Sequence, residues 1–388
     1  MDKLIITRLE DKICTATVSE GKVVQLTLEP DSGPSILQNI YIGKVQKVVP
    51  GINAAFVDIA PGVSGYYSLT ENKEHHFVSG HSGKLKAGDE IAVQVSRDAV
   101  KTKAPVLTAN ITLTGRYCVF TSGKPGIGFS SKLKDAAWKA QMREALGGVS
   151  GIIVRTNAGG LPPEMVLQEF EQLKGLYESI RAGWSCRTCY SCLYQSEPSY
   201  IAGIRDSISG SLKEIVTDEP VFYRELKDYM EKHQREDAEK LVFYEDSLLP
   251  LKKLYSLHTA LEKAMGKKVW LKSGGYLVIE PTEAMVVIDV NTGKYSGKKK
   301  MAETILRTNL EAAEEIGRQL RLRNLSGIIM VDFIDMEAAE DKQSLMHYLT
   351  EVVSKDPVKT TVVDMTGLNL VEITRKKVRK PLYEQVLS

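Results

Sequence analysis

The chain has 388 residues, 43% of them hydrophobic and 26% charged, which is enough for roughly two to four domains with buried cores. Its 51 Lys and Arg residues nearly balance 49 Asp and Glu residues, which excludes a uniformly basic surface for nucleic acid. No apolar run is long enough to predict a signal peptide or a membrane span. Five unevenly spaced cysteines argue against a secreted disulfide framework and favour a reducing cytoplasm.

The first third of the chain predicts β-structure. Residues 1–36 alternate polar and apolar residues in ICTATV and VVQLTL, which predicts two or three strands whose partners lie elsewhere. Residues 37–113 contain five short strand-like runs separated by Gly, Pro and Asp: IYIGKVQKVV, AAFVDI, GYYSL, EIAVQVSR and VLTANITL. This pattern is typical of a small antiparallel barrel, and an OB-fold is the natural candidate.

The middle of the chain predicts mixed structure. Helical stretches on both sides of the strand GIIVRT indicate a compact α/β insertion over residues 116–205, which ends in a polar, Cys-rich segment. A Thr/Asp cap followed by Pro predicts a helix from about residue 219. A second helix, HTALEKAMG, then leads into the strands VWLK and GGYLVIE.

Residues 284–336 predict a βαβ unit with parallel strands. AMVVIDV and GIIMVDFI are apolar runs typical of buried strands, and a long amphipathic helix separates them. Asp289 and Asp332 fall near the carboxyl ends of these strands, which meet at one sheet edge, while Asn291 points to the same side as Asp289. The pair suits a hard cation such as Mg²⁺. Alternatively, each Asp only caps the loop or helix that follows it.

Three long motifs resemble the catalytic core of the ribonuclease E/G family: VVIDVNTGKYSG, RTNLEAAEEIGRQLRLRNLSGIIMVDFIDM and GLNLVEITRKKVRKPL. The resemblance spans nearly the whole chain and implies a multidomain α/β plus β architecture. Its four parts would be an RNase H-like subdomain (1–36 plus 206–270), an OB-fold RNA-binding domain (37–115), a 5′-phosphate sensor insertion (116–205) and a DNase I-like catalytic domain (271–388). The RNase H-like part would carry no catalytic carboxylates.

The resemblance also implies an activity: Mg²⁺-dependent endonucleolytic hydrolysis of single-stranded RNA, stimulated by a 5′-monophosphate and acting in RNA processing and decay. Two alternatives stay open, namely a catalytically silent RNA-binding or scaffold protein and a metal-dependent phosphoesterase for small molecules. By resemblance, Asp289 and Asp332 bind the metal, Asn291 holds the scissile phosphate, and Lys359 is the basic residue near the site. The alternative for Lys359 is a solvated surface lysine, and the alternative for Asp335 is a residue that only orients loop amides.

RNA contacts are implied outside the catalytic domain as well. Phe56, Tyr66 and Lys103 match positions with which the family grips the strand, and an aromatic face stacks on any base. Alternatively, Phe56 fills the barrel core. Arg155 and Thr156 match the pocket that recognises a 5′-monophosphate, for which a guanidinium and a hydroxyl are suitable donors. The alternative for Arg155 is an arginine that ends a strand in solvent.

Three cysteines form a separate candidate site. Cys186, Cys189 and Cys192 have a spacing suited to a soft metal such as Zn²⁺, but no fourth ligand is close in sequence. Family members bridge two subunits with zinc through a Cys pair after the catalytic domain, and this sequence stops at Ser388 without that pair. Either the bridge is absent, or the cluster replaces it, or these are three unpaired thiols. A homo-oligomer therefore remains one possible partner besides single-stranded RNA.

Overall fold

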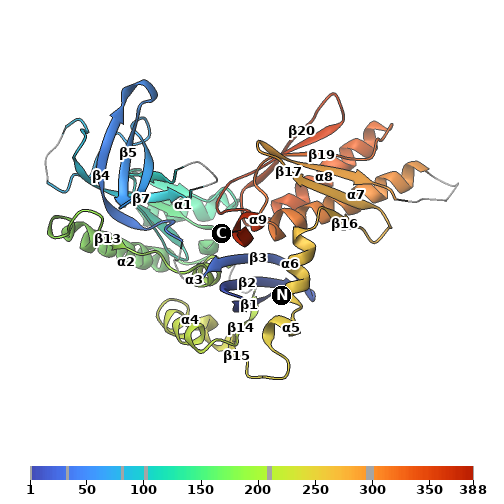
Figure 1. The fold of residues 1–388 in the computed structure, drawn as a ribbon, viewed down its shortest axis with the longest axis horizontal. Helices are drawn as coiled ribbons and strands as arrows, with labels where there is room; N and C mark the ends of the chain where they lie inside the picture. The colour runs from blue at the N-terminus through green and yellow to red at the C-terminus, as the bar shows by residue number, and fades with distance from the viewer. Residues whose placement is uncertain are drawn as a thin grey trace. The chain divides into compact units, whose positions relative to one another are not determined.

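The structure, a computed structural model, describes residues 2–31, 35–79, 83–99, 104–207, 212–293 and 301–387. The chain divides into two compact units, and the first of them is discontinuous in sequence. This first unit contains residues 1–33 and 212–388, and the second contains residues 34–211. Figure 1 traces both units along the chain.

The first unit contains a five-stranded sheet that joins distant segments. Its order is β15-β14-β1-β2-β3, and β1 pairs in parallel with β14, so the N-terminal strands find their partner more than 200 residues away. The strands are β1 (Asp2–Leu9), β2 (Lys12–Ser19), β3 (Lys22–Pro30), β14 (Leu212–Thr217) and β15 (Leu241–Phe243). The helices of this part are α4 (Pro220–His233), α5 (Leu251–Leu254), α6 (Leu257–Met265) and α9 (Leu382–Leu387), with the 3₁₀ turn η4 (Arg235–Lys240).

A six-stranded sheet in the same unit has the order β16-β17-β18-β19-β21-β20, and it is called the catalytic sheet below because most of it lies in the predicted catalytic domain. Its strands are β16 (Lys268–Trp270), β17 (Tyr276–Pro281), β18 (Met285–Asn291), β19 (Gly327–Asp332), β20 (Thr360–Met365) and β21 (Leu370–Arg375). Strands β18 and β19 are parallel and are linked through α7 (Met301–Leu322), while α8 (Ala339–Ser354) follows β19. The predicted βαβ unit is therefore present.

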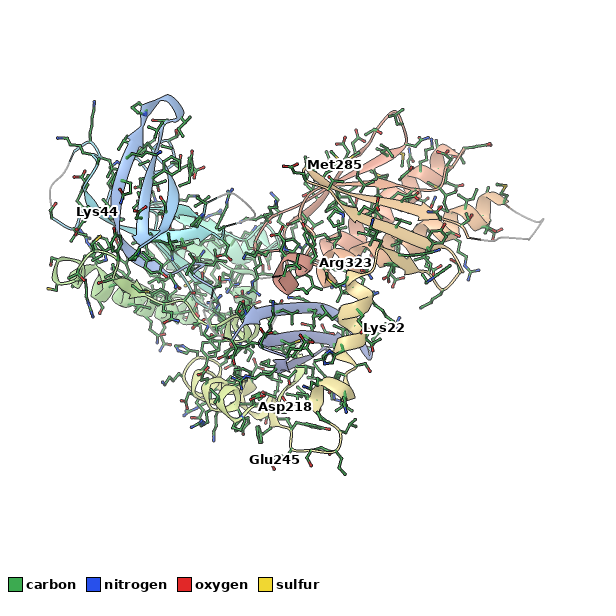
Figure 2. The ribbon with its side chains drawn as sticks, viewed as in Figure 1. Lys22, Lys44, Asp218, Glu245, Met285 and Arg323 are labelled. Carbon is green, nitrogen blue, oxygen red and sulfur yellow. The ribbon has the colours of Figure 1, made fainter. Side chains whose placement is uncertain are left out.

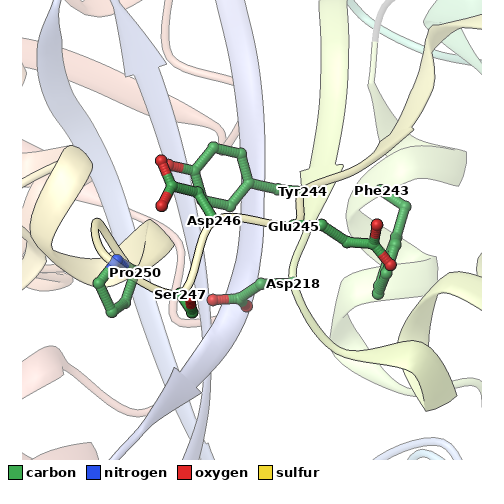
Figure 3. Close-up of a pocket in the computed structure, with 7 residues that line it drawn as sticks. All are labelled: Asp218, Phe243, Tyr244, Glu245, Asp246, Ser247 and Pro250. Carbon is green, nitrogen blue, oxygen red and sulfur yellow. The ribbon is translucent and has the colours of Figure 1, made fainter.

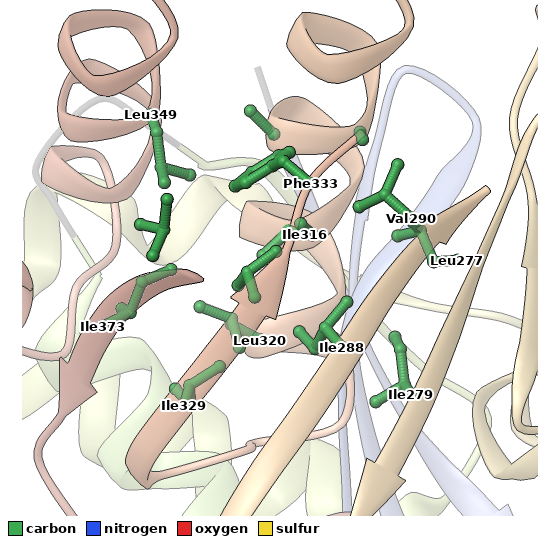
Figure 4. Packing of buried hydrophobic residues seen from close by; sticks show 14 of the residues in the cluster. Leu277, Ile279, Ile288, Val290, Ile316, Leu320, Ile329, Phe333, Leu349 and Ile373 are labelled. Carbon is green, nitrogen blue, oxygen red and sulfur yellow. The ribbon is translucent and has the colours of Figure 1, made fainter. Parts of the chain in front are cut away.

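One face of the catalytic sheet forms the largest apolar core of the unit. Figure 4 shows strand residues such as Ile288 and Ile329 packed against Ile316 and Leu320 of α7 and Leu349 of α8. Helices α7 and α8 approach closely at Gly317, where an added Cβ would lie 2.4 Å from Cγ1 of the facing valine. These contacts fix both helices on the same side of the sheet.

Among the described residues, nothing covers the opposite face of this sheet, contrary to the prediction of buried strands. Alternate residues of β18 are buried and exposed, and Val287 and Ile328 keep 38% and 50% of their surface exposed. Apolar side chains therefore occupy both faces, although only one face lies under helices. The sequence run alone did not distinguish a doubly covered strand from an apolar strand with one open face.

The second unit contains a closed barrel of five strands. Its order is β4-β5-β6-β8-β7, and pairing of β4 with β7 closes it, consistent with the predicted OB-fold. The strands are β4 (Ile40–Val49), β5 (Ala54–Ala60), β6 (Val63–Ser68), β7 (Glu90–Arg97) and β8 (Val106–Thr108). The strand β13 (Cys192–Tyr194) pairs beside β4, and the 3₁₀ turn η1 (Pro50–Ile52) follows β4 in the chain.

The predicted fifth strand, VLTANITL, divides into two strands of different sheets. After β8, the side chain of Asn72 accepts hydrogen bonds from the Thr108 hydroxyl and the Ala109 amide, at 2.9 and 2.8 Å. The chain then turns and enters a four-stranded sheet ordered β11-β12-β10-β9. That sheet contains β9 (Thr112–Thr114), β10 (Cys118–Thr121), β11 (Ile127–Phe129) and β12 (Ile152–Val154).

Helices accompany the four-stranded sheet of the second unit. They are α1 (Ala136–Ala145), α2 (Pro163–Ala182) and α3 (Ser199–Asp206), with the 3₁₀ turns η2 (Thr156–Ala158) and η3 (Trp184–Cys186). Phe170 and Tyr177 of α2 pack against Phe120 of β10, with ring centroids 6.0 and 4.8 Å apart. Within the described ranges, none of the helices has the length and apolar character that a membrane span requires.

Candidate active site

Two carboxylates meet on the open face of the catalytic sheet. Asp289 on β18 and Asp332 at the end of β19 are register partners in the parallel pair, and both are exposed. Neighbouring strands lie about 4.8 Å apart, so the two side chains leave adjacent backbone positions on the same face. In Figure 2 the label Met285 marks the start of β18, the strand that carries Asp289 and ends at Asn291.

The electrostatics of the pair follow from this proximity. Partial burial raises the pKa of Asp332, and the negative charges of Asp289 and Asp335 raise it further. Asn291 donates a hydrogen bond of 2.7 Å from Nδ2 to Oδ2 of Asp289, which orients that carboxylate. Asp335 accepts a longer bond of 3.3 Å from Asn369. Among the described residues, three carboxylates thus bring negative charge to this part of the sheet.

The structure does not bring Lys359 to this pair. Lys359 precedes β20, and its carbonyl accepts a hydrogen bond from the amide of Lys376 at the far end of β21. The β21 partner of Asp332 is Leu370, at the other end of that strand. At about 3.3 Å per residue, the two ends lie roughly 20 Å apart. Lys359 therefore lies at the opposite end of the catalytic sheet, and the prediction that it is a basic residue near the site is not supported.

The barrel presents Phe56 and Tyr66 on its outer side. These residues are opposite each other on β5 and β6, with ring centroids 6.3 Å apart, and both are partly exposed. Their neighbours Val57 and Tyr67 fill the barrel core instead, which excludes the alternative that Phe56 is a core residue. The ammonium of Lys47 lies 5.0 Å from the Phe56 ring centroid. Lys103 lies outside the described residues.

Arg155 and Thr156 lie together at the end of β12, but they already have partners. Arg155 donates to the carbonyl of Gly115 at 2.5 Å and to Asp206 at 2.8 Å. The Thr156 hydroxyl is 2.9 Å from the hydroxyl of Ser130. Sequence reasoning missed Asp206, because 51 residues separate it from Arg155 and no local pattern links them.

The ion pair of Asp206 is shared between two arginines. Burial acts to raise the pKa of Asp206, but the guanidinium groups of Arg205 and Arg155 outweigh it and hold the pKa below its ordinary value. Arg205 also contacts Glu197 at 2.9 Å. Two positive and two negative groups thus balance, so an added phosphate must compete with Asp206 for Arg155.

The three clustered cysteines do not converge on one point. Cys186 and Cys192 are exposed, Cys189 is half-buried, and all three are free thiols. Across the described ranges, no group of three or more His, Cys, Asp and Glu side chains is arranged to hold a metal ion. The lysine-rich segment 294–300, a further candidate for phosphate contact, lies outside those ranges.

A surface pocket lies elsewhere in the first unit. Figure 3 shows it at the ends of β14 and β15, lined by Asp218, Phe243, Tyr244, Glu245, Asp246, Ser247 and Pro250. Its three carboxylates repel a phosphodiester backbone rather than attract it. The pocket is therefore a poor candidate for RNA, and the open face of the catalytic sheet is the better one.

Known proteins of one family are similar to most of this chain. The Ribonuclease E/G family matches residues 112–378, a range that includes β18, α7 and β19. The chain is 36% identical to ribonuclease G of Haemophilus influenzae, an alignment that covers 96% of this chain and 78% of that protein. It is 32% identical to ribonuclease G of Escherichia coli strain K12, covering 99% and 81% respectively. It is also 32% identical to ribonuclease E of Nostoc, covering 99% of this chain and 57% of that protein.

Proposed function

This chain belongs to the ribonuclease E/G family, and on that premise we propose that it is an endoribonuclease that hydrolyses single-stranded RNA during RNA processing and decay. The observation that carries the proposal is the register pairing of Asp289 with Asp332 on an open sheet face. The relatives named ribonuclease G and ribonuclease E support the same activity.

The residues of the site fit a magnesium ion. Asp289 and Asp332 would hold it, since Mg²⁺ takes one or two carboxylates and fills its other positions with water. Partial burial and the negative charges of Asp289 and Asp335 raise the pKa of Asp332, and a cation would neutralise that charge. When bound there, Mg²⁺ would polarise the phosphodiester and lower the pKa of a water molecule. The expected products are a 5′-phosphate and a 3′-hydroxyl.

The residues of this chain have separable roles in that proposal. Asn291 fixes the orientation of Asp289 through its 2.7 Å hydrogen bond. The amide of Asn291 is also well placed to donate to the attacked phosphate, because it lies on the same face one pleat further along β18. Phe56 and Tyr66 would stack on bases of the substrate at the barrel. No basic side chain is assigned to proton transfer, since Lys359 lies at the other end of the sheet.

A cleavage assay tests the catalytic assignment. We expect Asp289→Asn and Asp332→Asn to abolish cleavage of a short 5′-monophosphorylated single-stranded RNA while its binding, measured by fluorescence anisotropy, persists. Asp228→Asn, an exposed carboxylate on α4, is the matched control and should cleave normally. Unchanged turnover in either active-site variant contradicts the assignment.

The 5′-phosphate sensing role rests on Arg155 and Thr156. A terminal phosphate would replace Asp206 as the acceptor of the Arg155 guanidinium, whose forked donors suit phosphate oxygens. Arg155→Ala should therefore reduce cleavage of 5′-monophosphorylated RNA toward the rate for 5′-hydroxyl RNA. Asp206→Asn removes the competing carboxylate and should retain the preference for the monophosphate. An equal loss on both substrates in Arg155→Ala, or no loss, counts against sensing; Arg187→Ala is the control.

A further inference from the structure

Two aromatic rings and a lysine occupy the edge of the catalytic sheet next to the active site. Trp270 of the edge strand β16 keeps 65% of its surface exposed, although a tryptophan is usually largely buried. Its ring centroid lies 5.3 Å from that of Tyr276 on β17. The ammonium of Lys268 lies 4.0 Å from the Trp270 centroid and 3.5 Å from the Tyr276 centroid. We call these three residues the edge cluster.

Strand register places the edge cluster on the same face as the carboxylates. Trp270 pairs with Tyr276, and Tyr276 pairs with Asn291, so these three residues form one row across the sheet. Directly paired residues project to the same face. With strands about 4.8 Å apart, the backbone of Tyr276 lies about 5 Å from that of Asn291, and Trp270 lies about 10 Å away.

Lys268 belongs to the row of the catalytic pair. It pairs with Val278, which pairs with Asp289, which in turn pairs with Asp332. Its backbone is therefore also about 10 Å from Asp289 on the same face. A lysine at this distance brings positive charge beside a site rich in carboxylates, where a phosphate backbone needs neutralisation.

The geometry of the cluster leaves aromatic surface available. The two ring planes of Trp270 and Tyr276 are inclined by 62°, so they do not stack face to face on each other. The ammonium of Lys268 makes a cation–π contact with each ring. These contacts stabilise the hairpin of β16 and β17. They do not explain why the Trp270 side chain, beside the proposed active site, stays about two-thirds exposed.

We propose that the edge cluster is a base-stacking subsite for single-stranded RNA, which receives the base of a nucleotide close to the scissile phosphate. Trp270 and Tyr276 supply the aromatic surface, and Lys268 contacts the adjoining phosphate. Because every base has a π-face, the subsite positions the strand without selecting its sequence. The inference rests on the proposed endoribonuclease activity, and it assigns a substrate contact within the first unit that is separate from Phe56 and Tyr66.

A paired substitution in protein and substrate tests the stacking contact. The substrate is a labelled 5′-monophosphorylated oligoribonucleotide with one cleavage site, and one nucleotide at a time is made abasic. Trp270→Ala should lower kcat/KM by about 5- to 150-fold, the range that base–aromatic stacking supplies. One abasic position should cause a similar loss in the unaltered enzyme and little further loss in Trp270→Ala. Trp270→Phe should restore most of the activity.

Two controls separate stacking from a structural role. Lys267→Ala is matched to Lys268→Ala, because Lys267 is the adjacent residue and its ammonium is paired with Glu280 at 2.8 Å instead of with the rings. Only Lys268→Ala should weaken cleavage at moderate salt. If Trp270→Ala lowers cleavage of every abasic substrate by the same factor, or if it has no effect, the subsite is refuted.

A binding readout keeps this test independent of cleavage. Oligouridylate added to the Asp289→Asn chain should quench tryptophan fluorescence, and Trp270→Phe should remove most of that quenching. The other two tryptophans, Trp138 and Trp184, are in the second unit and stay in place. Quenching that is undiminished in Trp270→Phe overturns the subsite. Normal quenching without any cleavage by the unaltered chain would instead refute the endoribonuclease activity alone.

Discussion

Removing one carboxylate from the catalytic pair should stabilise the protein while it abolishes cleavage. Asp289 and Asp332 leave adjacent strands about 5 Å apart, and two unit charges at that distance repel by about 1 kcal/mol in water. The aqueous value applies because both side chains are exposed. Asp289→Asn should therefore raise the free energy of unfolding by up to about 1 kcal/mol, or the Tm by about 1 °C for a chain of this length.

The pH dependence of that gain follows from the raised pKa of Asp332. A carboxyl whose pKa is higher in the folded chain than in the unfolded chain binds more protons when folded, so it lowers stability as the pH rises through its pKa. The gain in the free energy of unfolding in Asp289→Asn should be full at neutral pH. It should shrink on acidification, once Asp332 is protonated in the unaltered protein and no longer repels Asp289.

Urea unfolding and cleavage assays on the same preparations test the expected rise in stability and the expected loss of activity. Loss of an outer-shell partner of a metal ligand costs about 10–100-fold, so loss of a direct ligand should cost at least about 100-fold in activity. Magnesium should raise the Tm of the unaltered chain more than that of Asp289→Asn, because a ligand stabilises only the state that binds it. The reasoning fails if Asp289→Asn is destabilised at neutral pH, or if its response to magnesium is unchanged while Asp228→Asn behaves normally.

Three further predictions concern the rest of the fold. Arg375 and Asp356 form an ion pair at 2.8 Å with side chains only 3% and 4% exposed, so Arg375→Ala should cost about 3–5 kcal/mol in urea unfolding and the double variant less than the sum. Gly317→Ala should cost about 1–3 kcal/mol in the same assay, because its Cβ has no room against α8. Burial raises the pKa of Cys14 to about 12 and that of Cys118 further, so native protein should react with a thiol reagent at the three other cysteines and unfolded protein at all five.

The neighbouring positions of Asp289 and Asp332 were predicted correctly because local patterns in the sequence determine them. Apolar runs of strand length on both sides of a long amphipathic helix permit few arrangements, and a right-handed parallel crossover aligns the two strand ends. Asp289 and Asp332 then become neighbours without any information about more distant contacts. The barrel was predicted for a similar reason, since its five strands are consecutive in the chain and Gly, Pro and Asp residues mark the segments between them.

Features that depend on distant pairing were not predictable in the same way. The position of Lys359 follows from the antiparallel register of β20 and β21, which includes a bulge, and neither the register nor the bulge is visible in the run DPVKTTVVDM. The contact of Arg155 with Asp206 likewise joins residues from different elements. A motif match placed both basic residues in a role, but it carried no information about what surrounds them.

The open face of the catalytic sheet connects these observations. Strands β18 and β19 read as continuous apolar runs, yet only one of their faces packs against α7 and α8. The apolar side chains of the other face, including Val287 and Ile328, are exposed beside the carboxylates. Exposed apolar surface that is rimmed by polar groups usually marks a binding site. The same face carries Trp270, so the unexpectedly apolar strands and the edge cluster have one explanation under the proposed function: both would provide contact surface for bases, while Asp289 and Asp332 would act on the phosphate.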